Sequence, residues 1–364
     1  MSIVKEKPVI LTAADKAAWD ACFNSLPAAL RDINYSYDYH MMYQSNGDGE
    51  IRLFYYERDK EKFFYPYLQR RIFVGGNASP YNDIESAYGY TGPLSTTTDD
   101  NFLREADEEF RRHCKEENIV TEFIRFNPLL SNETVFHSSE TMDVIPLRDY
   151  VTVELTSSAE ELFLGFSPQN RNKIRKAEKT GVQIRFDREA TDFDSFVSIY
   201  LENMRRLNAA KMYFFSDSFF KSLKQLVQQN GTFCTAMLDG KIIGATVFLR
   251  GETIAHYFLS SADEEGKKNA VSNLMLHHGI QWAKKQGLEQ MHLGGGVTGA
   301  ADDPLLVFKQ NFSEKTVRYC IGKRIHNSRV YEALIKQWEE QYPDKAVQYK
   351  PILQRYRLTK EDMQ

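Results

Sequence analysis

The stretch EQMHLGGGVTGAADDPLLVFKQNF occupies residues 289–312 and combines a strand, a glycine loop and a short helix. Met291 and Leu293 predict a strand that runs into Gly294-Gly295-Gly296, and Asp303-Pro304 opens an apolar helix. Three consecutive glycines give the backbone freedom at an entropic cost, so they suit a loop that a ligand approaches closely. On these residues alone, a ligand loop at the carboxyl end of a strand and a plain strand-to-helix turn are equally good interpretations.

The chain has 364 residues, which is more than one hydrophobic core usually supports. We therefore expect two domains, at residues 1–150 and 151–364. The net charge of -4 at pH 7 gives no global reason to expect nucleic acid or an anionic membrane as a partner. No segment approaches about 18 uninterrupted apolar residues, and the start of the chain lacks a signal-peptide pattern. We expect a cytoplasmic protein without a transmembrane segment.

The cysteines and histidines give no sign of a metal site. The 4 cysteines lie far apart and form no CxxC pair, so they predict ordinary cytosolic thiols. His277 and His278 are adjacent in a predicted helix, point to different faces and cannot easily share a metal. We expect no metal site and no permanently bound cofactor.

Helical and strand patterns alternate along both halves of the chain. In the first half they predict a strand hairpin, a helix and another strand, at 51–56 with 63–69, 99–117 and 119–126. In the second half they predict a strand and three helices, at 151–155, 168–179, 193–207 and 216–229. A hairpin through Asp239-Gly240, a strand at 253–259 and a helix at 270–285 precede the glycine loop. The order predicts an α/β (α+β) fold whose mixed, mostly antiparallel sheets are flanked by helices.

Residues 83–94 read DIESAYGYTGPL, so tyrosines alternate with glycines before a proline ends the run. This composition suits a loop that holds aromatic faces against a ligand, with Tyr88 and Tyr90 as the candidate substrate-binding residues. A buried turn whose phenol groups are satisfied in the core is an equally good interpretation.

The predicted helix at 168–179 reads PQNRNKIRKAEK. Arg171, Arg175 and Lys179 recur every four residues, so three cations share one face and repel one another unless an anion binds there. Arg171, Lys173 and Arg175 are therefore candidate ligands of a diphosphate. The alternative is an exposed, solvated basic face.

Three motifs stand in the second half: NRNKIRKAEKTGV at 170–182, LGGG at 293–296 and FKQNF at 308–312. Together with the order of elements, they resemble the FemAB-like branch of the GNAT acyltransferase superfamily. The resemblance covers most of the chain, with the first half supported mainly by residues 83–94. It implies two GNAT-like lobes and the transfer of an aminoacyl group from aminoacyl-tRNA to a peptidoglycan precursor. The family also merges into envelope acyltransferases that use acyl-CoA.

The resemblance also implies a catalytic site. In Fem-like enzymes the lysine of the Phe-Lys motif is thought to neutralise charge in the transition state, which points to Lys309 beside Phe308. The N–H groups of Gly295 or Gly296 could share the oxyanion of the tetrahedral intermediate. An exposed lysine at the end of a helix is the alternative for Lys309.

The general base is left open by the residues. His256, Tyr257 and Asp263 lie on or just after a predicted strand near the expected cleft, but their spacing singles out none of them. Proton loss assisted by the substrate is an equally good interpretation. Tyr257 is also a candidate substrate-binding residue.

Two departures from related families bear on the donor. The chain lacks the long charged helical hairpin that larger Fem proteins carry. Its residues 263–270 read DEEGKKNA, with one glycine and with carboxylates where CoA-dependent enzymes of this superfamily bind pyrophosphate. We therefore favour aminoacyl-tRNA over acyl-CoA as the donor substrate.

The expected function is aminoacyl transfer to an amino group of a cell-envelope, peptidoglycan-type precursor. The expected partners are a nucleotide- or lipid-linked glycan precursor and aminoacyl-tRNA, and peripheral contact with the inner membrane face is compatible with this role. One alternative is an acyl-CoA-dependent N-acyltransferase that acts on an amino sugar in envelope polysaccharide synthesis. A second is an inactive GNAT-like protein that binds a glycan nucleotide.

Overall fold

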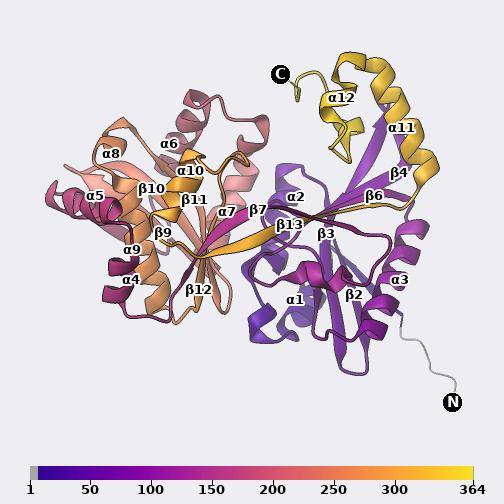
Figure 1. The fold of residues 1–364 in the computed structure, drawn as a ribbon, viewed down its shortest axis with the longest axis horizontal. Coiled ribbons are helices and arrows are strands. Elements are labelled where there is room, and N and C mark those ends of the chain that lie inside the picture. Colours follow the sequence, from indigo (N-terminus) through magenta and orange to yellow (C-terminus); the bar gives the residue numbers. More distant parts are fainter. Residues whose placement is uncertain (1–6, 364) are drawn as a thin grey trace. The chain divides into compact units, whose positions relative to one another are not determined.

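The computed structural model describes residues 7–363, which divide into two compact units (Figure 1). The first unit takes its residues from 1–30, 47–146 and 320–364, and the second comprises 31–46 and 147–319. One division therefore lies close to the expected boundary after residue 150. Two segments depart from that simple split, because 31–46 belong to the second unit and 320–364 to the first.

The second unit is built on a mixed sheet with the strand order β7–β12–β11–β10–β9–β8. The strands span Asp143–Glu154 (β7), Gln183–Asp187 (β8), Gly231–Leu238 (β9), Lys241–Arg250 (β10), Ile254–Ala262 (β11) and Gln290–Gly294 (β12). β11 and β12 run parallel, and the other neighbours run antiparallel. The β9–β10 hairpin turns through Asp239 and Gly240, both with positive φ, as an Asp-Gly turn predicts.

Helices cover both faces of this sheet. One face carries the core shared by Ala255, Met291 and Leu293 with the helices Ala159–Gly165 (α4), Pro168–Lys179 (α5) and Val271–Lys285 (α9). Alternate strand residues point to opposite faces, so Phe233 and Phe258 face the other way. There they contact the helices Phe193–Arg206 (α6) and Tyr37–Asn46 (α2), and α2 in turn packs on Asp217–Asn230 (α7).

The first unit has a sheet with the order β1–β2–β3–β4–β6–β13. Its strands span Val9–Thr12 (β1), Glu50–Arg58 (β2), Glu61–Val74 (β3), Asn77–Glu85 (β4), Ile119–Arg125 (β6) and Thr316–Ile325 (β13), and the short Leu94–Ser95 (β5) pairs with β3. β4 and β6 run parallel, and the other neighbours run antiparallel. The helices are Lys16–Asn24 (α1), Asp100–Glu116 (α3), Ser328–Gln341 (α11) and Ala346–Tyr349 (α12). Both sheets confirm the predicted α/β (α+β) class with mixed sheets flanked by helices.

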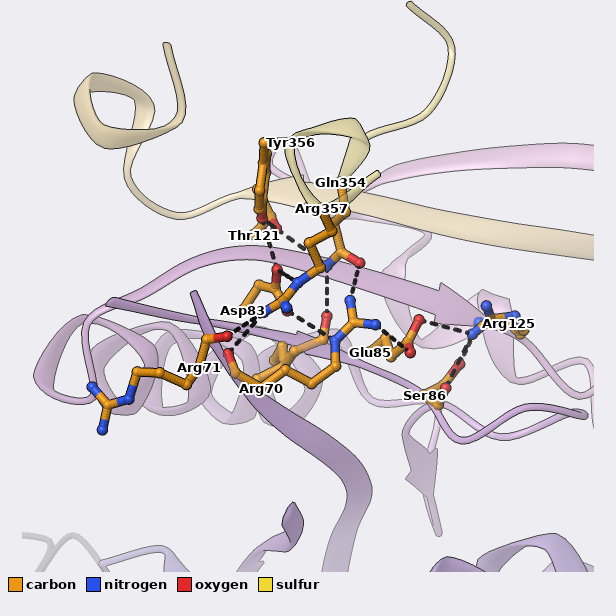
Figure 2. Close-up of polar contacts among 11 residues, drawn as sticks. Arg70, Arg71, Asp83, Glu85, Ser86, Thr121, Arg125, Gln354, Tyr356 and Arg357 are labelled. Carbon is orange, nitrogen blue, oxygen red and sulfur yellow. Dashed lines mark hydrogen bonds and ion pairs between the residues drawn. The ribbon is translucent and has the colours of Figure 1, made fainter. Parts of the chain in front are cut away.

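A buried carboxylate ties the end of the chain to the first unit (Figure 2). Asp83, which is fully buried in β4, accepts hydrogen bonds from Arg70 Nε at 3.0 Å, Tyr356 Oη at 2.9 Å and Arg357 Nε at 2.5 Å. The first residues of the expected ligand loop at 83–94 therefore belong to a strand, and Asp83 is engaged by the protein itself.

Gln354 lies beside this carboxylate and bridges two parallel strands (Figure 2). Its Nε2 atom donates to the Ile84 carbonyl of β4 at 3.1 Å and to Thr121 Oγ1 of β6 at 3.2 Å. Such side-chain bonds between segments more than 200 residues apart explain why the C-terminal residues belong to the first unit.

Candidate active site

The two parallel strands of the second unit part where the glycine loop begins. β11 and β12 pair only between residues 254–256 and 290–292. Beyond this point β11 continues to Ala262, whereas β12 ends at Gly294. Gly294 has a φ of 82°, a conformation that favours glycine. The loop therefore stands at the carboxyl end of a central strand, the place where α/β sheets tend to bind ligands.

The next two glycines are required by close packing. A Cβ atom on Gly295 would lie 2.2 Å from the ring of Tyr150, and one on Gly296 would lie 2.5 Å from the carboxyl group of Asp303. No side chain fits at such distances without displacing its neighbour. The backbone of the loop thus packs against the Tyr150 ring at Gly295 and against the Asp303 carboxylate at Gly296.

Two residues of opposite charge, Asp303 and Arg148, bind the backbone that follows the three glycines. Asp303 caps the helix Pro304–Gln310 (α10), and its Oδ2 atom also accepts hydrogen bonds from Thr298 N and Oγ1 at 2.8 and 2.9 Å. The Thr298 N–H bond is the main cause that lowers the Asp303 pKa to about 2. Arg148 donates to the carbonyls of Val297 and Thr298 at 3.3 and 3.0 Å. These bonds hold the backbone at Val297 and Thr298 against Arg148 and Asp303.

Lys309 lies on α10 and reaches back to the glycine loop. Its side-chain Nζ atom donates a hydrogen bond of 2.7 Å to the Gly295 carbonyl, and the residue is only 7% exposed. Burial lowers the Lys309 pKa to about 7, and the Asp303 charge opposes this shift. The alternative of an exposed helix-end lysine is therefore wrong. Within residues 7–363, the N–H groups of Gly295 and Gly296 donate to no loop carbonyl.

The neighbouring Phe308 of the same motif packs beside the core. Its ring lies 5.5 Å from the ring of Phe312, at an angle of 67°. Both rings contact the apolar cluster of the second unit. The geometry gives Phe308 a packing contact that holds α10 while Lys309 turns toward the loop.

A buried amide network, which the sequence did not single out, fixes the end of α10. Asn170 of α5 is 1% exposed; its Nδ2 atom donates to the Asn311 carbonyl at 3.0 Å, and its Oδ1 atom accepts from Asn273 of α9 at 2.8 Å. Asn170 lies on the same side of α5 as the buried Ile174 and Ala177. A polar residue at that apolar spacing was the signal that could have found it.

Two of the three candidate phosphate ligands on the basic helix α5 contact other groups of the protein. Arg171 donates to the Leu164 carbonyl at 2.6 Å and to the Phe166 carbonyl, so it covers the end of α4. The guanidinium of Arg175 lies 5.3 Å from the ring centre of Phe163. Lys173 is exposed. Diphosphate binding by these residues stays a prediction.

The tyrosine candidates lie in different surroundings. Tyr257 of β11 faces the apolar core, 5.9 Å from the ring of Phe248, and burial raises its pKa to about 12. In the first unit, Tyr88 and Tyr90 are half-buried, and the Tyr88 ring lies 5.9 Å from the guanidinium of Arg125. None of these positions tests substrate binding, so the three tyrosines stay predictions.

The segment before α9 does not resemble an open phosphate loop. It forms the short helix Glu264–Lys268 (α8), and the N–H of its third residue, Gly266, is already bound by the Asp263 carboxylate at 2.8 Å. A Cβ atom on Gly266 would lie 2.1 Å from the Ile243 carbonyl, so this helix sits directly on β10. A carboxylate thus occupies the place where a pyrophosphate would need free amide donors.

Among residues 7–363, no helix is long and apolar enough to cross a membrane. In the same part of the chain, no group of three or more His, Cys, Asp or Glu side chains could hold a metal ion.

Comparisons with known proteins find a domain family, a relative and solved structures that are similar to this chain. The Acetyltransferase (GNAT) domain family matches residues 168–304. The UDP-N-acetylmuramoylpentapeptide-lysine N(6)-alanyltransferase of Weissella viridescens is 23% identical over 175 residues, which cover 47% of this chain and 51% of the relative. The chain thus spans about half the length of this curated relative.

Solved structures show the same fold over nearly the whole chain. FemX matches with a TM-score of 0.68 and 14% identity, covering 90% of this chain and 99% of FemX. A conserved protein of unknown function from Bacteroides thetaiotaomicron matches with a TM-score of 0.58 and 10% identity, covering 86% and 98%. The domain match lies within the second unit, and the alanyltransferase relative and the FemX fold are similar to this chain, as the motifs of a FemAB-like GNAT acyltransferase lead one to expect.

Proposed function

We propose that this protein transfers an aminoacyl group to an amino group of a nucleotide- or lipid-linked peptidoglycan precursor. The observation that carries the proposal is the buried Lys309, whose Nζ atom lies 2.7 Å from the Gly295 carbonyl of the glycine loop. The relative from Weissella viridescens is named as an alanyltransferase for the lysine N6 atom of a UDP-linked muramoyl pentapeptide. That name supports both the reaction class and the acceptor class.

The chemistry follows from the surroundings of Lys309. When an amine attacks the ester carbonyl of the donor, negative charge develops on the carbonyl oxygen. A protonated Lys309 neutralises this charge, and the N–H groups of Gly295 or Gly296 share it. The developing oxyanion itself favours the ammonium form of Lys309, which offsets the burial that lowers its pKa. One such donor is worth roughly a factor of 10²–10³ in kcat.

Aminoacyl-tRNA is the donor that we favour. The Asp263 carboxylate already holds the Gly266 N–H, and it would repel the pyrophosphate of an acyl-CoA. The proposal places the reaction in the cytoplasm, where aminoacyl-tRNA and nucleotide-linked precursors occur together, and peripheral contact with the inner membrane face is part of it. The candidates for contact with the acceptor remain Tyr88, Tyr90, Arg171, Lys173, Arg175 and Tyr257.

The experiment that tests the proposal is a transfer assay with radiolabelled alanyl-tRNA and UDP-linked muramyl pentapeptide containing lysine. We expect label to enter the pentapeptide, and Lys309→Ala to abolish transfer while the exposed control Lys176→Ala retains it. A calorimetric titration with acetyl-CoA runs in parallel. Micromolar binding of acetyl-CoA, worth about -8 kcal/mol, together with absence of transfer from alanyl-tRNA, would overturn the proposal.

A further inference from the structure

A buried acid–base pair lies in the second unit, outside the residues that the proposed mechanism uses. The Nε2 atom of His256 donates to Oδ1 of Asp32 at 2.8 Å, and the two residues are 4% and 2% exposed. Asp32 precedes the short helix Ile33–Tyr35 and also accepts the Ile33 N–H at 2.7 Å. The Asp32 carboxylate thus accepts a backbone and a side-chain hydrogen bond, and it orients the imidazole ring that faces it.

The position of Asp32 is fixed by close backbone packing. A Cβ atom on Gly251, in the turn before β11, would lie 2.7 Å from the Arg31 carbonyl and 2.8 Å from Asp32 Cα. Glu252 N donates to the same Arg31 carbonyl at 3.1 Å. The segment that carries Asp32 is thus docked onto the strand that carries His256.

A second histidine links this pair to the glycine loop. His292 of β12 lies directly opposite His256 in the parallel pairing, and their ring centres are 5.7 Å apart. The His292 ring lies 5.8 Å from the ring of Tyr150, which is the ring that packs against Gly295. The Gly295 carbonyl accepts the hydrogen bond from Lys309. The groups therefore form a continuous buried row from Asp32 to Lys309.

The charges along the row favour one resting state. Burial lowers the pKa of His292 well below its usual range, and the positive charges of His256 and Lys309 add to this effect. His292 is therefore neutral near pH 7, between Lys309 on one side and the Asp32–His256 pair on the other. The phenols of Tyr39 near Asp32 and of Tyr150 beside His292 also face the row. The Asp32 carboxylate lies 2.8 Å from His256 Nε2, so it balances a positive charge on that ring.

We propose that Asp32, His256 and His292 form a proton-accepting row behind Lys309, which takes up the proton that the acceptor amine must lose. This inference rests on the proposed function. The amine nitrogen gives one proton to the row and forms a bond to the donor carbonyl carbon. The bond from that carbon to the ribose oxygen then breaks, and the oxygen leaves with a proton returned from the row. Protons and electrons balance, and no further reactant is needed.

Kinetics of three variants test the row in the full-length protein. His256→Gln keeps an N–H donor for Asp32 but cannot accept a proton, so we expect kcat to fall by about 10²–10⁴-fold with an unchanged KM for the muramyl pentapeptide. Asp32→Asn removes the charge that favours the imidazolium, so we expect the acid limb of the pH–rate profile to move to lower pH. The control His278→Gln, on α9, should change neither quantity. Full turnover of His256→Gln with an unmoved pH profile would overturn the inference.

A second measurement separates this inference from the proposed function. Imidazole titrations of His256 and His292 are followed by NMR in the wild type, in Asp32→Asn and in Lys309→Met, without any substrate. We expect Asp32→Asn to move the His256 titration to lower pH and Lys309→Met to move the His292 titration to higher pH. Unshifted curves would overturn the row even if the wild type transfers alanine. If the wild type transfers nothing but the curves shift as expected, the proposed function falls and the coupled row stands.

Discussion

Replacing Lys309 with methionine should stabilise the protein while it destroys transfer. Lys309 is 7% exposed, and within residues 7–363 its ammonium group makes one hydrogen bond, to the Gly295 carbonyl. Burial is what lowers its pKa from 10.5 to about 7. Methionine has a similar length and no charge, so it fills the same space without the cost of burying an ammonium.

The size and the sign of the effect follow from that pKa difference. Below pH 7 both the folded and the unfolded chain carry the proton, and the buried charge costs the folded state about 5 kcal/mol, at about 1.4 kcal/mol per pKa unit. Between pH 7 and 10.5 the unfolded chain binds a proton that the folded chain lacks, so the free energy of unfolding rises with pH. From pH 6 to pH 9 we expect Lys309 to contribute a rise of about 3 kcal/mol. The Lys309→Met variant lacks this rise.

Urea unfolding at pH 6 and pH 9, followed by circular dichroism and by fluorescence, measures the effect. The advantage of Lys309→Met over the wild type should be largest at pH 6 and should shrink by about 3 kcal/mol at pH 9. Lys176→Met, which changes an exposed lysine of α5, serves as the matched control and should show no such dependence. A Lys309→Met variant that is less stable than the wild type at pH 6, or whose advantage is the same at both pH values, would refute the reasoning.

Three further substitutions test the supports of the two units. Gly295→Ala should lower transfer at least tenfold because its Cβ atom meets the Tyr150 ring at 2.2 Å, and Tyr150→Leu in the same chain should restore part of the rate. Asn170→Ala should cost about 1–3 kcal/mol of unfolding free energy, because the Asn311 carbonyl and the Asn273 amide lose their buried hydrogen-bond partner. A smaller loss with full activity would show that the network does not position α10. Asp83→Asn should cost about 1–3 kcal/mol in thermal or urea unfolding, because it removes the buried carboxylate that the partly buried Arg70 and Arg357 share, and an unchanged transition would contradict this.

Much of the architecture could be predicted because its signals are local. Ser167-Pro168 begins α5, and the Ser167 side chain accepts the Asn170 N–H, as its position before the helix predicts. The Asp239-Gly240 turn and the strand that enters Gly294 lie where the pattern predicted them. The first part of 83–94 was mistaken for a loop because the tyrosines and glycines that follow hid the end of β4.

The candidate site could be predicted only in part. The LGGG and FKQNF motifs identified the Gly295 and Lys309 pair, and the structure brings the two residues into contact. Arg171 carried the pattern of an anion ligand, yet it binds the carbonyls at the end of α4. A repeat of charges along a helix states which side chains share a face, but not which neighbouring backbone that face meets.

The sequence by itself determined many of the helices and turns, the glycine loop and the family resemblance, because helix caps, turns and short motifs depend on residues a few positions apart. Only the tertiary structure decided that Lys309 is buried, and burial is what moves its pKa. Likewise, Asp32 and His256 are 224 residues apart, and no local pattern connects them. Burial and charge pairing are set by whichever distant segments fold against a residue, so they become visible only when the whole chain is in place.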